Sequence, residues 1–216
     1  MEIKKVGVLG AGVMGGQIAA HLNNVGLEVI AFDLDLDIAN KGLEATKKLK
    51  PRPYYNIKTA DKIQAASFDQ LDLLKDCDWV IEAIAEKLEW KTDLYSKIEP
   101  HLSQNAIITS NTSGLLLSDL TSKMSDSLKK RFFITHFFNP PRYMKLVEFI
   151  TADNNSEEIV SFMKDFMTNM LGKGVVIAKD TPNFIANRIG TYGMMVCLQE
   201  AYKNNLSIED VDSWTD

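Results

Sequence analysis

The chain has 216 residues, 45% of them hydrophobic, which is enough for one α/β domain and the start of another. Its 29 acidic and 24 basic residues give a net charge of -5, with no block of like charges that would attract nucleic acid. Cys77 and Cys197 lie far apart, so we predict two buried thiols, with no disulfide and no metal site. Because no leader and no long apolar run stand out, we expect a cytoplasmic protein that does not insert into membranes.

The first predicted elements are a strand, a glycine turn, a helix and a second strand. Apolar and β-branched residues predict a strand over 3–9, and the helical spacing of apolar residues predicts a helix over 14–25. A second strand is predicted over 28–32. Together these elements form a βαβ unit with a right-handed crossover.

Strands and helices go on alternating after this unit, with a loop where Pro51 and Pro53 stop the second helix. The later elements are predicted as a helix over 35–50, a loop to 59, strands over 62–67, 79–84, 106–109, 132–138, 146–150 and 175–178, and helices over 71–75, 88–102, 117–123 and 157–170. This alternation predicts an α/β fold of the Rossmann type, a doubly wound, mostly parallel sheet with helices on both faces. The pattern is also compatible with an antiparallel direction for the last two or three strands.

A boundary is predicted at Thr181, where a proline follows and a long apolar helix begins near 184 and runs to 201. The segment 207–211 resembles the capped start of another helix. We therefore expect a Rossmann-type domain over 1–181, followed over 182–216 by the beginning of an all-α domain. Because that helix needs partners for its apolar surface, we expect the chain to be a piece cut just inside the second domain.

The glycines of the first turn predict a nucleotide site. They fit G-x-G-x-x-G between a strand and a helix, and an acidic residue, Asp33, ends the next strand. Such a turn brings backbone N–H groups to a pyrophosphate at the helix N-terminus. The Asp33 carboxylate would accept the ribose hydroxyls of NAD and repel the extra phosphate of NADP, so NAD is the predicted cofactor. The candidate contacts in the turn are Gly10, Gly12, Val13, Met14 and Gly15.

Three further polar clusters follow predicted strands, where ligands bind in open α/β sheets. They are residues 82–86 with Lys91, residues 110–113, and residues 136–140 with Glu148. Together with the glycine turn they resemble the 3-hydroxyacyl-CoA dehydrogenase family, above all in the segment H-F-F-N-P-x-x-x-M-K-L-V-E. The resemblance covers essentially the whole chain and implies an NAD-dependent oxidoreductase that acts on an acyl-CoA substrate.

His136 is the predicted catalytic base. Oxidation of a secondary alcohol needs a group that takes the hydroxyl proton near neutral pH, and histidine suits that task. Glu148 lies across a predicted reversal between two strands, so its carboxylate would orient the His136 ring and stabilise the imidazolium. The other histidines, His21 and His101, are interpreted as residues at helix surfaces or helix ends.

By resemblance, Ser113 and Asn139 contact the substrate and the nicotinamide side of the site, and Asn187 reaches it from the second domain. Each of them would also suit a loop cap. Glu86 and Lys91 match family positions that bind the nicotinamide ribose and neighbouring cofactor groups, although they would equally suit a solvated pair. Glu82, inside an apolar strand, receives no role.

Two departures from many family members point to a larger parent protein. Asn183 stands where many have glycine, and the region of Pro51 to Pro53 replaces a longer helical hairpin that helps to hold CoA. Both traits resemble bacterial enzymes in which the dehydrogenase is fused to an enoyl-CoA hydratase domain. By resemblance, family members also form homodimers through the helical domain. CoA contacts and acyl-chain preference therefore stay open.

The leading hypothesis is oxidation of L-3-hydroxyacyl-CoA to 3-ketoacyl-CoA in fatty-acid β-oxidation. One alternative is a nucleotide-binding module that is inactive without the rest of the helical domain. Another is a dehydrogenase of a hydroxy acid that carries no CoA.

Overall fold

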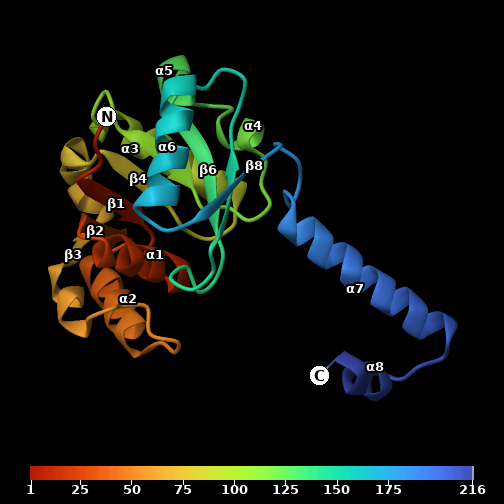
Figure 1. The fold of residues 1–216 in the computed structure, drawn as a ribbon. Coiled ribbons are helices and arrows are strands. Elements are labelled where there is room, and N and C mark those ends of the chain that lie inside the picture. The colour runs from red at the N-terminus through yellow and green to blue at the C-terminus, as the bar shows by residue number, and fades with distance from the viewer. Residues whose placement is uncertain (216) are drawn as a thin grey trace.

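The computed structural model describes residues 1–215, with side chains as far as Ser213, and the predicted segment 182–216 therefore ends outside the described residues. The body of the protein is built on an eight-stranded sheet in the order β3-β2-β1-β4-β5-β6-β7-β8 (Figure 1). Its strands are β1 (Lys5–Leu9), β2 (Glu28–Asp33), β3 (Gln64–Ser67), β4 (Trp79–Glu82), β5 (Ile107–Ser110), β6 (Phe132–Phe137), β7 (Leu146–Ile150) and β8 (Gly174–Ala178).

The first six strands of the chain are mutually parallel, and β7 pairs antiparallel with β6. Because β8 runs parallel to β7, the last two strands both run against the other six. The predicted Rossmann-type, mostly parallel sheet is confirmed. The reversal between β6 and β7 matters for function, because it places the ends of these two strands beside the glycine turn of β1.

Helices cover the two faces of the sheet. They are α1 (Val13–Asn24), α2 (Leu36–Lys48), α3 (Leu88–Ile98), α4 (Leu117–Leu120), α5 (Asp126–Lys129) and α6 (Glu157–Asn169), with the 3₁₀ helices η1 (Ile57–Lys62), η2 (Phe68–Asp76) and η3 (Glu99–His101). Alternate residues of β4 point to opposite faces, so Ile81 joins one apolar core with α1 and α6, and Val80 joins a second with α3 and α4. This is the doubly covered sheet that the sequence predicts.

Two predictions about single residues are only partly correct, because His21 lies in the last turn of α1 but not at a surface, and only one of the two cysteines is buried. His21 is buried, because the turn after α6 covers this side of α1, and its Nε2 lies 3.2 Å from the carbonyl oxygen of Leu171. Burial, together with the nearby positive charge of Lys173, lowers the pKa of His21 to about 4. Cys77 is buried as predicted, but Cys197 is exposed.

The C-terminal arm, residues 185–215, leaves the body after β8. It consists of α7 (Ala186–Lys203) and α8 (Ile208–Thr215), and α7 projects away from the sheet (Figure 1). The chain turns into the arm through Asn183 and Phe184, whose φ angles are 62° and 48°. None of the residues of α7 is buried, which explains the exposure of Cys197. Among the described residues, no helix has the length and hydropathy needed to cross a membrane.

Candidate active site

The glycine turn after β1 is shaped by close backbone contacts. Gly10 has a φ of 101°, and a side chain there would lie 2.7 Å from the carbonyl oxygen of Ala83. A side chain at Gly15 would collide with the carbonyl oxygen of Gly10. Gly12 differs from both, because the space beside its Cα is open and it forms the N-cap of α1 without a capping side chain. The positive end of α1 is thus accessible to an anionic group.

Asp33 lies beside this turn at the end of β2. Its Oδ2 accepts a hydrogen bond of 2.8 Å from the backbone N–H of Ala11, and its Oδ1 accepts one of 2.8 Å from Leu34. The carboxylate lines a cavity of about 640 Å³ together with Gly10 and Gly12. It is therefore held by the backbone while it still faces the space where a ligand would lie.

A second cavity, of about 420 Å³, continues from the first along the carboxyl ends of the strands. Both cavities are lined by residues 83–85, so they form one groove from Asp33 to His136. The predicted residues that line the second cavity are Met14, Glu86, Ser113, His136 and Asn139. The structure thus brings residues from the ends of five strands, β1, β2, β4, β5 and β6, to one groove.

His136 and Glu148 form a buried pair at the far end of this groove. They lie directly opposite one another in the antiparallel register of β6 and β7, and Nδ1 of His136 is 2.8 Å from Oε2 of Glu148. The other carboxylate oxygen, Oε1, accepts hydrogen bonds of 3.0 and 2.8 Å from the N–H groups of Ile185 and Ala186 at the start of α7. Because Nδ1 faces Glu148, Nε2 is the ring nitrogen left for a ligand in the cavity.

The three polar residues predicted around this pair are Ser113, Asn139 and Asn187, and each forms a hydrogen bond with a residue of another segment. The Oδ1 of Asn139 accepts a 2.9 Å hydrogen bond from Gln17, and the Nδ2 of Asn187 donates one of 2.9 Å to the carbonyl oxygen of Ser113. Asn111, which the sequence analysis leaves without a role, accepts a 2.9 Å bond from the N–H of Phe137. Asn111 belongs to the predicted cluster 110–113, whereas Gln17 positions the site although no sequence motif singles it out.

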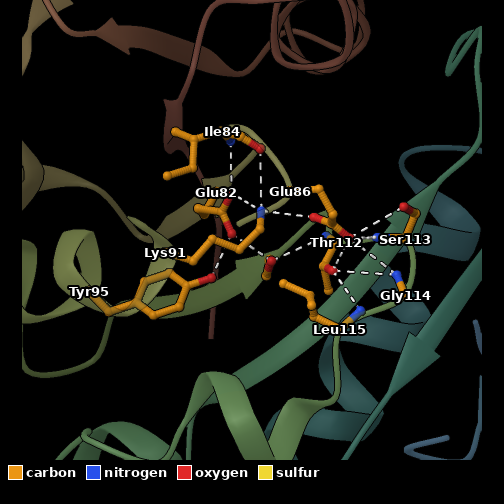
Figure 2. A network of polar contacts seen from close by, with 10 residues as sticks. Glu82, Ile84, Glu86, Lys91, Tyr95, Thr112, Ser113, Gly114 and Leu115 are labelled. Carbon is orange, nitrogen blue, oxygen red and sulfur yellow. Dashed lines mark hydrogen bonds and ion pairs between the residues drawn. The ribbon is translucent and has the colours of Figure 1, made fainter. Parts of the chain in front are cut away.

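Glu86 and Lys91 are not a solvated pair. Lys91 is only 1% exposed and lies beneath the groove, where its Nζ is 2.6 Å from Oε1 of Glu82 and 3.3 Å from Oε2 of Glu86. Glu86 itself lines the second cavity, and Figure 2 shows its carboxylate between Lys91 and Thr112. Burial alone would raise the pKa of Glu86, but the Thr112 hydroxyl and the charge of Lys91 offset this and keep the pKa below its usual value.

The groove fits a dinucleotide on three counts. An uncapped helix N-terminus faces it at Gly12, a carboxylate stands at one end at Asp33, and the cavity continues to a histidine at the other end. NAD would place its pyrophosphate at Gly12 and its two ribose rings toward Asp33 and Glu86. The fold and the groove therefore define a dinucleotide-binding domain of the oxidoreductase class.

Comparison with known sequences identifies the family. Residues 5–181 match the NAD-binding domain of 3-hydroxyacyl-CoA dehydrogenases. The chain belongs to the 3-hydroxyacyl-CoA dehydrogenase family, and NAD is the cofactor of the domain that it matches.

Relatives and solved structures agree with this assignment. The chain is 43% identical to a probable 3-hydroxyacyl-CoA dehydrogenase from Bacillus subtilis, over 99% of this chain and 30% of that protein. It is 42% identical to a putative fatty acid oxidation complex trifunctional enzyme from Rickettsia prowazekii, over 98% of this chain and again 30% of the relative. A crystal structure of (S)-3-hydroxybutyryl-CoA dehydrogenase from Ralstonia eutropha matches with a TM-score of 0.83 and 30% identity, over 96% of this chain and 75% of that one. The chain thus spans less than a third of the length of the two relatives.

Proposed function

We propose that this chain carries the NAD-dependent oxidation of L-3-hydroxyacyl-CoA to 3-ketoacyl-CoA, as a step of fatty-acid β-oxidation. The observation that carries the proposal is the buried pair of His136 and Glu148, which opens into the cavity at the end of the groove. A base at this place is what removal of a hydroxyl proton requires. The family membership of residues 5–181 supports the same chemistry.

In the proposed reaction, Nε2 of His136 takes the proton of the substrate hydroxyl. Glu148 keeps Nδ1 protonated and stabilises the imidazolium that forms, while the N–H groups of Ile185 and Ala186 hold its second oxygen. When bound, NAD supplies the acceptor for the hydride of the substrate carbon. The surrounding rings of Phe138 and Phe184, with centroids 4.4 and 5.8 Å from that of His136, shield the pair from water.

The polar residues around the pair receive supporting roles. Ser113, Asn139 and Asn187 would contact the substrate oxygen, the thioester or the nicotinamide side of NAD, because a hydroxyl and two amides donate hydrogen bonds without competing as bases. Glu86 would accept from the nicotinamide ribose, and Lys91 would support it from below. Gly10, Gly12, Val13, Met14 and Gly15 would surround the pyrophosphate, with Asp33 on the adenine ribose.

The test is an assay of acetoacetyl-CoA reduction by NADH, in which the rate is measured as the decrease in NADH absorbance. We expect turnover with the CoA thioester and NADH, little with NADPH, and little with free acetoacetate. Equal rates with free acetoacetate would favour a dehydrogenase of hydroxy acids without CoA. If the chain did not bind NADH at all, both the proposed reaction and the proposed cofactor would be wrong.

A second candidate function is a nucleotide-binding module that needs further chain to act. It is favoured by α7, whose apolar residues are uncovered while its first turn reaches Glu148. Comparing the turnover of this chain with that of the chain continued by a helical domain distinguishes this module from a dehydrogenase that is active by itself.

We also propose that residues 1–181 are the NAD-binding domain, and that 182–216 begin a helical domain through which the parent protein would dimerise. A fused enoyl-CoA hydratase domain is a further proposal, and a cytoplasmic location stays a prediction.

A further inference from the structure

Glu82 is the centre of a buried polar network beneath the groove (Figure 2). It ends β4 with no exposed surface, and four donors converge on its carboxylate. Oε1 accepts from the N–H of Ile84 at 2.7 Å and from Nζ of Lys91 at 2.6 Å. Oε2 accepts from the hydroxyl groups of Tyr95 and Ser110, each at 2.6 Å. Such a set of donors stabilises an ionised carboxylate in the protein interior.

Lys91 links Glu82 to the groove, because its ammonium group contacts both Glu82 and Glu86. Its ammonium group has three acceptors, namely Oε1 of Glu82, the carbonyl oxygen of Ile84 at 3.3 Å and Oε2 of Glu86 at 3.3 Å. Three donors and three acceptors leave this buried cation fully paired. The position of Lys91, and with it the support under Glu86, therefore depends on the carboxylate of Glu82.

The same network reaches the turn that follows β5. The Ser110 hydroxyl that donates to Glu82 also accepts from the N–H of Thr112 at 3.1 Å. Oε1 of Glu86 accepts from the Thr112 hydroxyl and from the N–H groups of Ser113 at 2.8 Å and Gly114 at 3.2 Å. Glu82 thus supports the two segments that contact each other at Glu86. These segments are the loop after β4 and the turn after β5.

We propose that Glu82 is a positioning residue for the nicotinamide end of the groove, which acts by fixing the place of Glu86 through Lys91. The inference rests on the proposed use of this groove for NAD. Glu82, Lys91 and Glu86 carry two negative charges and one positive charge, and Glu86 alone presents its charge to the cavity. A neutral residue at 82 would leave Glu86 as the only anionic partner of Lys91, which would draw the Glu86 carboxylate toward Lys91 and away from a ribose hydroxyl in the cavity.

The alternative is that the ion pair of Glu82 and Lys91 contributes to stability alone. The binding of different ligands distinguishes this alternative from a positioning role. Glu86 lines the cavity of His136, whereas Asp33 lies at the other end of the groove. ADP, which lacks the nicotinamide half, would reach only the Asp33 end. Positioning by Glu82 therefore predicts weaker binding of NADH with unchanged binding of ADP.

The experiment is a double-mutant cycle on this chain, with dissociation constants for NADH and ADP measured by titration. We expect Glu82→Gln to weaken NADH binding at least about tenfold, the size of one displaced charge-assisted hydrogen bond, and to leave ADP within twofold. We expect Glu86→Gln to do the same, and the double variant to be no weaker than Glu86→Gln alone, because the two residues act in series. The emission of bound NADH should shift toward that of free NADH.

The control is Thr135→Val, which removes a buried hydroxyl bonded at 2.9 Å to Thr109 in a neighbouring part of the sheet. It should lower stability and leave both affinities unchanged. If Glu82→Gln does not fold, Glu82→Gln combined with Lys91→Met removes both buried charges and is expected to fold, because neither partner is left unpaired. Wild-type NADH affinity in either variant would overturn the proposal. Failure of the unaltered chain to bind NADH would instead defeat the proposed function.

Discussion

The helices α1 and α7 show how differently the body and the C-terminal arm are stabilised. Nine of the 12 residues of α1 are buried against the sheet and α2, whereas none of the 18 residues of α7 is buried. Both segments carry enough apolar residues at helical spacing to predict a helix. The difference teaches that this spacing predicts a helix without predicting what will cover it. Hydrogen bonds join the arm to the body at its first residues, Ile185, Ala186 and Asn187.

The start of the arm lies in the candidate active site. Asp180 accepts hydrogen bonds of 2.6 and 3.0 Å from the N–H groups of Leu117 and Ser118, and Phe184 is buried beside His136. Glu148 binds the first N–H groups of α7, and Asn187 binds Ser113. The junction between body and arm therefore also supports the pair of His136 and Glu148, for which we propose the catalytic role. The three predictions that follow test this contrast, from the largest expected effect to the smallest.

Phe184→Ala should have the largest effect on stability. Its side chain is buried in the core that includes α3 and α4, and loss of a buried phenylalanine side chain typically costs about 3 to 5 kcal/mol. The matched variant in the arm is Leu198→Ala, which removes an exposed leucine of α7 and should change the free energy of unfolding by less than about 0.5 kcal/mol. Denaturant unfolding of both variants measures the difference. A large cost for Leu198→Ala would mean that the arm is covered in solution.

His21 should make the body sensitive to acid. Its pKa is lowered to about 4 by burial and by Lys173, while the unfolded chain has the ordinary value near 6.5. The unfolded state thus binds more protons between these values, so this contribution to stability is complete above pH 6.5 and is lost as the pH falls toward 4. The loss is at most about 3 kcal/mol.

Unfolding of His21→Gln at a series of pH values tests this dependence. The variant cannot titrate there, and it should lose less stability than the wild type over this range. Leu198→Ala, in the exposed helix α7, is the control and should keep the wild-type slope, because it removes no titratable group. An unchanged slope in His21→Gln would contradict the assignment.

Asp33→Asn should change cofactor selection without affecting the arm. The amide keeps the size of the side chain but loses the charge that accepts ribose hydroxyls and repels a phosphate. We expect NADH binding to weaken about tenfold, or about 1.4 kcal/mol, and the preference for NADH over NADPH to shrink. Asp35→Asn, at the N-cap of α2, is the control and should keep the preference. Tighter binding of NADPH by the unaltered chain would contradict the role of Asp33.

Features with a local pattern could be predicted from the sequence. The order of strands and helices follows from hydrophobic spacing, and the approach of His136 to Glu148 follows from a short reversal between two apolar strands. The helix α5, with four residues, is too short to give a periodic pattern and was not predicted. A 3₁₀ helix, η1, stands where a loop and the start of a strand were expected.

Features that depend on tertiary contacts could not be predicted. A single glutamate in an apolar strand gave no sign that Lys91, Tyr95 and Ser110 would converge on Glu82, because these partners come from a helix and another strand. His21 does lie in the last turn of α1, but its burial could not be predicted, because the covering turn at Leu171 lies far along the chain. The exposure of Cys197 depends in the same way on what packs against α7.

The most direct test of the proposed chemistry is His136→Gln, assayed with acetoacetyl-CoA and NADH in whichever form turns over, this chain or the chain continued by a helical domain. The amide cannot exchange a proton with the substrate oxygen, so kcat should fall by a factor on the order of 10³. The dissociation constant of NADH should stay within about threefold, since the groove from Gly12 to Glu86 is intact. Near-normal kcat in this variant would contradict the assignment of His136 as the base.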